Sequence, residues 1–304
     1  MQTTLRTSFL RYTLTCLLFF LFCDAFAQEN TPKWSVKPYV GFQQSRFDWS
    51  IAGNAKGTNP NVLSELIWDK LKGPSYGLDI SYKIIEKLTV KVANQYSNIT
   101  KGEATDTDYA DDNRQGAFYY DLLNANKGYL YNIDLQLNYK LLKMGEFSIN
   151  PIVGLSYNQQ KFYLLESASN PASNGLNSTY EARYKGFYFG GEFVLKTKAF
   201  SIGATILGGF YKYTAKANWN LIPDFEKPVS FTHKANSFAL SGDVNFSVPL
   251  NKRLSIEADY KINNINTYTG VDKAYFNNRN TEETQFNGAS FRKNAVFVGL
   301  KFDF

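Results

Sequence analysis

The chain has 304 residues, with 33 Lys or Arg and 27 Asp or Glu, so its formal net charge is only +6. This modest, interspersed excess argues against nucleic-acid binding and suits contact with anionic lipid head groups. Both cysteines, Cys16 and Cys23, lie near the N-terminus. The chain beyond them therefore has no thiol that could form a disulfide or bind a metal.

Residues 1–27 have the pattern of a cleaved secretory signal peptide. Arg6 and Arg11 give a positive n-region, residues 17–22 carry an apolar h-region, and residues 25–27, Ala-Phe-Ala, fit a cleavage site. We therefore predict export, followed by one mature domain over residues 28–304. An uncleaved N-terminal anchor is the alternative, which the short apolar run disfavours. After residue 27 no apolar run is long enough for a transmembrane helix.

The mature segment is predicted to form antiparallel strands because apolar and polar residues alternate along it. In residues 129–141 every odd position is apolar or aromatic, and every even position from Asn132 to Lys140 is polar. Side chains alternate across a strand with a period of two, whereas a helix would scatter these residues over all its faces. Ten strands are predicted, at residues 34–48, 62–84 (with a bend at Gly73-Pro74), 88–99, 129–141, 146–163, 178–196, 200–216, 229–248, 253–267 and 291–304.

Tight turns and long connections alternate along these strands. The turns near residues 85, 144, 198 and 250 are short, whereas residues 50–61, 100–128, 164–177, 217–228 and 268–290 form long polar connections. This asymmetry is typical of outer-membrane barrels, which keep their long loops outside the cell, and an even strand number puts both termini on the periplasmic side. We predict an all-β, ten-stranded antiparallel transmembrane β-barrel in the bacterial outer membrane. Its narrow lumen is expected to be packed with polar side chains.

An acidic cluster lies in the second long connection, with aspartates at 106, 108, 111 and 112. Carboxylates this close repel each other, so the pKa of one of them is expected to rise. Three explanations stay open from the spacing alone. The cluster is a solvated loop, a site for a cation such as calcium, or a pair that activates water in catalysis.

Several segments resemble motifs of the omptin family, ten-stranded outer-membrane endopeptidases that cut at basic residues and need lipopolysaccharide. Residues 64–68 resemble the family's Ser-x-Leu-x-Trp, and residues 106–111 resemble its Asp-x-Asp-Trp-x-Asp, which holds the water-activating pair. Residues 157–161 and 183–190 resemble segments that contact lipid A phosphates. The resemblance implies catalytic roles for Asp106 and Asp108, and lipid A binding by Tyr157, Lys161, Arg183, Lys185 and Lys234.

The chain departs from the omptin pattern at the general base. Omptins also need an Asp-x-His dyad in the fourth long loop, and the matching residues 216–224 contain no histidine. The single histidine, His233, lies in predicted strand eight and is a weak candidate base. Hydrolysis without a base would lose roughly 10²–10⁴-fold in rate. Lys161 stands where the family has an arginine, and a lysine lacks the bidentate fork that grips a phosphate.

Three functional hypotheses follow. The first is a surface barrel that has lost or altered the protease centre and binds lipopolysaccharide, surfaces or host molecules through its long loops. The second is an active omptin-type endopeptidase that uses Asp106 and Asp108. The third is a narrow channel or a purely structural barrel. We expect a monomer with no metal and no cofactor apart from bound lipopolysaccharide.

Overall fold

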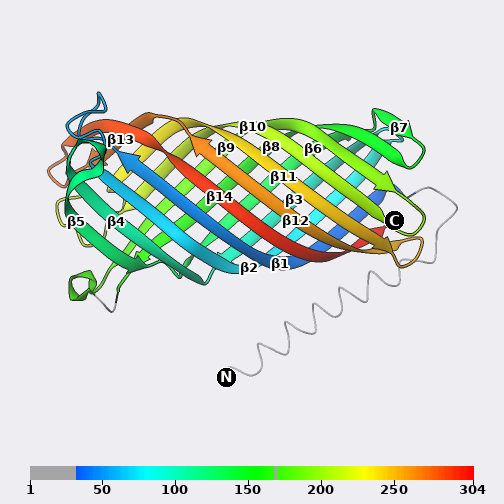
Figure 1. The fold of residues 1–304 in the computed structure, drawn as a ribbon, viewed down its shortest axis with the longest axis horizontal. Coiled ribbons are helices and arrows are strands. Elements are labelled where there is room, and N and C mark those ends of the chain that lie inside the picture. The colour runs from blue at the N-terminus through cyan, green and yellow to red at the C-terminus, as the bar shows by residue number, and fades with distance from the viewer. Residues whose placement is uncertain (1–31, 168–169) are drawn as a thin grey trace, which may run out of the picture. The chain divides into compact units, whose positions relative to one another are not determined.

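The computed structural model describes residues 32–167 and 170–304, and residues 33–304 form one compact unit. The antiparallel strands of this unit close into a barrel (Figure 1). The predicted signal peptide lies outside the described residues. Among those that are described, no helical segment has the length and apolar character that a membrane-spanning helix needs.

In the described part of the chain the barrel has ten strands around its circumference, some of them interrupted. It closes because β1 pairs with both β2 and β14. Three wall strands continue after an interruption as β4, β5 and β13, and β7 is a short addition to β8. The strands are β1 (Trp34–Ile51), β2 (Ser64–Ile85), β3 (Leu88–Ile99), β4 (Lys101–Asp111), β5 (Gln115–Asn124), β6 (Gly128–Tyr139), β7 (Leu142–Met144), β8 (Phe147–Leu165), β9 (Asn177–Lys196), β10 (Ser201–Asn218), β11 (Phe231–Pro249), β12 (Leu254–Thr267), β13 (Gly270–Tyr275) and β14 (Thr281–Asp303). Two 3-10 turns, η2 (Asp112–Arg114) and η3 (Pro171–Ser173), lie in the long connections.

The predicted ten-stranded antiparallel barrel is confirmed, but two predicted long loops are wrong. Residues 100–128 mostly form the β4–β5 hairpin, and residues 268–290 form β13 and the first part of β14. These segments look like loops because polar and turn-forming residues are frequent in them, yet their backbone ladder continues well beyond the apolar part of the wall. The bend in β2 also lies earlier than predicted, at the register shift between Asp69 and Lys72, where Lys70 has a φ of +52°.

A belt of exposed apolar side chains surrounds the barrel on the side of the short turns. On β6, Ile133, Leu135 and Leu137 face outwards as the alternation predicts. Such a belt is the lipid-facing surface of a transmembrane barrel, so it marks the membrane-spanning segments. Its other members include Val40, Phe42, Tyr76, Leu78, Val92, Val153, Leu155, Phe187, Phe189, Ile202, Ile206, Phe210, Leu240, Val244, Ile256, Val296 and Val298.

The interior of the barrel has two different halves. Within the belt it holds a polar chamber of about 600 Å³, lined by ionic side chains such as Lys37, Asp79 and Lys91. Beyond the belt, towards the long loops, buried apolar residues fill the barrel. We call the rings of this set the aromatic plug: Phe47, Trp49, Trp68, Phe162, Tyr180, Tyr184, Tyr213, Phe231 and Phe286. The prediction of a lumen packed with polar side chains therefore holds for the belt half and is wrong for the other.

Candidate functional site

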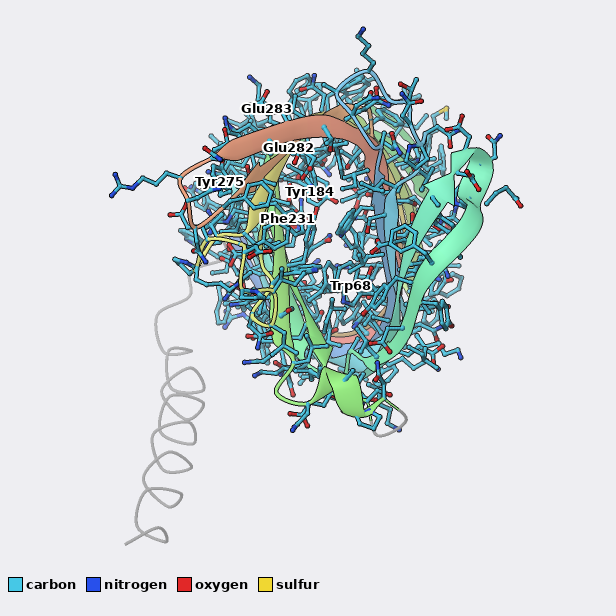
Figure 2. The ribbon with its side chains drawn as sticks, turned by 90° about the vertical axis from the view of Figure 1, so that its left-hand side faces the viewer. Trp68, Tyr184, Phe231, Tyr275, Glu282 and Glu283 are labelled. Atoms are coloured by element: carbon cyan, nitrogen blue, oxygen red, sulfur yellow. The ribbon has the colours of Figure 1, made fainter. Side chains whose placement is uncertain are left out.

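A cleft of about 700 Å³ opens at the long-loop end of the barrel. Its floor is the top of the aromatic plug, where Trp49 and Phe231 pack edge to face with their ring centroids 5.7 Å apart. Figure 2 looks into this end and shows Trp68, Tyr184 and Phe231 within the ring of strands. The cleft is therefore a pocket closed at the bottom by stacked rings.

One wall of the cleft carries carboxylates from the β4–β5 hairpin. Asp106 and Asp121 are direct cross-strand partners, and Asp108 follows on the same face of β4. Tyr119 lies opposite Asp108, and its hydroxyl donates to a carboxylate oxygen of Asp121 at 3.4 Å. The strand period of two turns all of these side chains into the cleft. Three carboxylates are thus held on two adjacent rows of one wall.

Two carboxyl groups of this wall, those of Asp106 and Asp108, have raised pKa values. Burial, followed by the charges of Asp108 and Asp121, raises the pKa of Asp106 to about 8. Burial also raises the pKa of Asp108, against a hydrogen bond from Ser64. The expected rise from repulsion is present, but desolvation is the larger cause. At neutral pH the Asp106 carboxyl therefore holds its proton unless a positive charge enters the cleft.

The facing wall is apolar. The connection between β10 and β11 presents Trp219, Leu221, Ile222 and Phe225 to the cleft. The ammonium group of Lys227 holds this connection by donating to the backbone carbonyl oxygens of Trp219 and Ile222. This is the segment where the omptin resemblance implies an Asp-x-His dyad. Apolar side chains occupy the place of the dyad here.

His233 does not reach the cleft. It is fully buried beneath Trp49, and its ring stacks on Phe286 with centroids 4.3 Å apart. Its Nδ1 lies 2.7 Å from the Tyr180 hydroxyl, and its Nε2 lies 3.0 Å from a carboxylate oxygen of Asp272. Burial lowers the pKa of the imidazole. In this position His233 is held within the plug, and its partner Asp272 is the member of the pair that lines the cleft.

The predicted lipid A residues lie together on the outer wall, directly beyond the apolar belt. Tyr157, Lys185 and Lys212 form one cross-strand row across β8, β9 and β10, next to the belt row of Leu155, Phe187 and Phe210. The Lys185 ammonium lies 5.4 Å from the centre of the Tyr157 ring. The next rows hold the remaining predicted members, with Gln159, Arg183, Thr214 and Lys234 in one row and Lys161 paired with Glu181 in the other.

Glu181 partly neutralises this outer-wall patch. Its carboxylate accepts a hydrogen bond from Arg183 and lies 3.8 Å from the Lys216 ammonium. The structure therefore supplies from β9 an acid beside Arg183. The five predicted residues are brought onto one surface, and Lys212 is an additional member that the sequence reasoning missed.

Sequence reasoning also missed most of the cleft. Asp121 was overlooked because residues 100–128 were assigned to a loop. The alternation of Tyr119, Asp121 and Leu123 against Phe118, Tyr120 and Leu122 was the signal that could have revealed a strand. Asp112 lies outside the carboxylate wall, where its carboxylate accepts a hydrogen bond from the backbone N–H of Asn61 at 2.7 Å. No group of three or more His, Cys, Asp or Glu among residues 32–167 and 170–304 is arranged to hold a metal ion.

Comparisons with known proteins agree with this architecture. No curated protein matches the chain. Its structure is similar to that of the outer membrane protease OmpT from Escherichia coli, with a TM-score of 0.70 and 14% identity over 92% of this chain and 99% of that one. The translocator domain of the autotransporter NalP from Neisseria meningitidis is more distant, with a TM-score of 0.40 and 9% identity over 98% of both chains. The OmpT likeness shows an omptin-like barrel fold and nothing about catalysis. Residues 37–304 match the model of the Pom family, described as Protochlamydia outer membrane protein, and the chain therefore belongs to this family of outer-membrane proteins.

Proposed function

We propose that this barrel is a surface binding protein whose cleft takes a ligand with a positively charged group. The observation that carries the proposal is the pairing of a three-carboxylate wall with an apolar wall in one cleft of about 700 Å³. We place the long-loop end outside the cell and the termini in the periplasm, as the asymmetry of the connections favours. In this orientation the cleft is open to extracellular ligands.

The charge of the ligand follows from the electrostatics of the wall. Deprotonation of Asp106 is costly because the group is desolvated beside Asp108 and Asp121. An ammonium or guanidinium group within the cleft would offset this cost and favour the carboxylate. The rings of Tyr119 and Trp219 offer further contacts to a cation, since aromatic faces attract positive charge.

The plug favours binding over conduction. A ring of stacked side chains, including Phe47 and Phe162 with centroids 4.8 Å apart, separates the cleft from the polar chamber. A continuous water path is what a channel needs, and close-packed rings interrupt it. The wild-type barrel is expected to give no discrete conductance steps in planar bilayers, and steady steps of uniform size would support the channel hypothesis instead.

Hydrolysis is the second candidate function. The fold similarity to OmpT and the cross-strand pair of Asp106 and Asp121 favour it, because two adjacent carboxyl groups that share a proton can activate water. Against it stands the absence of a histidine from the facing connection. Refolded protein with lipopolysaccharide is expected not to cleave dibasic peptides. Steady turnover that Asp106→Ala abolishes would establish the endopeptidase.

The outer wall supports a second binding role, directed at anionic lipid. Lysine and arginine side chains just beyond an apolar belt lie at the height of lipid head groups, where lipopolysaccharide carries phosphates. Loss of both Lys161 and Arg183 to alanine is expected to weaken lipid A binding by about thirtyfold, since each of the two charges near such a surface contributes about 1 kcal/mol. Unchanged lipid A binding by the double variant would rule out the assignment. We further propose that the chain acts as a monomer.

The cleft proposal is tested with arginine amide as a small cationic probe. Calorimetric titration into the refolded barrel is expected to show binding that strengthens as pH rises through about 8, because the probe must displace the Asp106 proton. Asp106→Asn removes the charge and is expected to weaken binding about tenfold.

Glu103→Gln is the matched control for this titration. Glu103 lies on the same strand but pairs with Lys70 at 2.7 Å on the outer side of the wall. Binding by this variant should equal that of the wild type. If Asp106→Asn and Glu103→Gln weaken binding equally, or if neither weakens it, a cleft site for the cation is contradicted.

A further inference from the structure

Strand β5 has a free edge along most of its length. It pairs with β4 from Gln115 to Asn124, whereas its other edge meets β8 only at the pair Asn124–Leu165. Within residues 32–167 and 170–304, no other strand pairs with residues 115–123. An edge strand presents unpaired N–H and C=O groups, which are a template for a further strand.

The outer face of β5 is apolar although it lies away from the belt. Tyr120 is 64% exposed and Leu122 is also exposed, whereas Phe118, which is 65% exposed, lies at the register shift and lines the rim of the cleft. Leu122 pairs with Thr105, which lies roughly 30 Å of strand beyond the belt residue Tyr96. Lipid contact at the belt therefore does not account for this row. Protected edges usually carry lysine, proline or a bulge. Residues 115–124 contain neither lysine nor proline, and their register shift lies at Phe118, so residues 119–123 form a regular edge.

The inner face of β5 belongs to the cleft. Tyr119, Asp121 and Leu123 point inwards, and Asp106 lies directly across from Asp121 on β4. A strand added to the free edge would alternate in the same way, with one set of side chains beside the carboxylates and the other beside Tyr120 and Leu122. The edge, the apolar row and the acidic wall thus describe a single docking surface.

We propose that the free edge of β5 captures an extended peptide as an added strand, with basic side chains turned inwards and apolar side chains turned outwards. The inference rests on the proposed cationic ligand for its charge and adds the backbone mode of recognition. A second copy of this chain fits the edge less well. Its own β5 would bring a second Asp121 to the same face, where like charges oppose each other.

Backbone methylation of a peptide tests the proposal directly. The probe is an eight-residue peptide that alternates lysine and valine, titrated into the full-length barrel in detergent. Two derivatives carry N-methyl groups on alternate residues, in one register or in the other. Only one register turns its N–H groups towards β5, so one derivative is expected to bind about tenfold or more weakly and the other like the parent. Equal binding by both derivatives would overturn strand addition.

Amide hydrogen exchange locates the added strand. The peptide is expected to slow exchange of alternate amides within residues 115–123, because those amides lack a partner on β4. Replacement of Tyr120 and Leu122 by threonine should weaken binding several-fold, whereas Tyr268→Thr, an exposed tyrosine outside β5, should leave it unchanged. Protection confined to other strands, or a stable dimer that the peptide does not displace, would contradict the proposal.

Arginine amide separates this inference from the proposed function. If arginine amide binds and needs the Asp106 carboxylate while the peptides show no register dependence, strand addition is wrong and the cationic cleft stands. If neither probe binds, both are wrong.

Discussion

The two halves of this barrel have opposite interiors around one continuous wall. Within the belt, outward side chains are apolar and the chamber is lined by charged side chains. Among these, the Lys37 ammonium lies 3.0 Å from a carboxylate oxygen of Glu257. Beyond the belt, outward side chains such as Arg183 and Lys185 are charged, and the interior is a ring-filled core. In each half the apolar side chains face the less polar surroundings, which are the lipid in the belt half and the barrel interior in the other half. The belt half is a membrane barrel and the other half is built like a soluble one.

The inversion can be followed along a single strand. On β10, Ile202, Ile206 and Phe210 face lipid, and from Tyr211 and Tyr213 onwards the apolar residues face inwards. The strand keeps its twist and pairing through the change, so only the hydrophobic phase shifts by one residue. The two surfaces for which we propose binding roles lie where this shift has occurred. The cleft is above the plug and the cationic outer patch is beside it.

The largest expected effect is the loss of a plug ring. Trp68 is fully buried, and its indole N–H donates to the backbone carbonyl of Tyr163 at 3.0 Å. Trp68→Ala is expected to destabilise the barrel by about 3–5 kcal/mol, because a large cavity opens in a packed core. Urea unfolding followed by the electrophoretic shift of the folded barrel measures it.

The control for Trp68, which lies on β2, is Trp34→Ala at the start of β1, at the opposite end of the barrel, where the indole is half-exposed. Its cost should be clearly smaller. Equal costs at the two sites would mean that the ring-filled half is no better packed than the rim, and the contrast between the halves would fail.

A smaller loss is expected in the polar chamber, by a different mechanism. Lys37 contacts Glu257 and Asp259, each at 3.0 Å. Lys37→Met would leave Asp259 without its cation and Glu257 with only the Lys301 ammonium, 4.0 Å away, at a cost of about 1–3 kcal/mol. Adding Glu257→Gln and Asp259→Asn is expected to restore much of the loss, because no unpaired charge then remains. The same unfolding measurement applies. A triple variant less stable than Lys37→Met alone would contradict this account of the chamber.

The smallest effect concerns the pH dependence of the cleft. The unfolded chain releases the Asp106 proton near pH 4, whereas the folded chain keeps it to about pH 8. The folded state binds more protons across this window, so stability falls as pH rises through it. Asp106→Asn should remove the dependence and leave the barrel about 1–2 kcal/mol more stable than the wild type at pH 9, after allowance for solvent screening. Unfolding at pH 5 and pH 9 tests this, and Glu103→Gln, with its solvent-exposed carboxylate, should behave like the wild type.

The sequence by itself determined the class of fold and the position of the lipid-facing rows. Period-two alternation, as in Ile133, Leu135 and Leu137, depends only on the geometry of a strand, so it can be recognised without any partner. Local motifs also indicated Asp106 and Asp108, in a segment predicted to be a loop, and the outer-wall cations, which lie on predicted strands. Their roles are still proposals.

Only the tertiary structure decided what the barrel encloses. Closure brings Phe47, Phe162 and Tyr180 into one stack from β1, β8 and β9, and no local pattern states that these strands share an interior. The same closure buries His233 under Trp49 and turns a predicted loop into the hairpin that places Asp121 beside Asp106. Alternation along one strand assigns two faces. Which of the two faces carries the polar side chains changes with position along the barrel axis. This change depends on the neighbouring strands that barrel closure brings together.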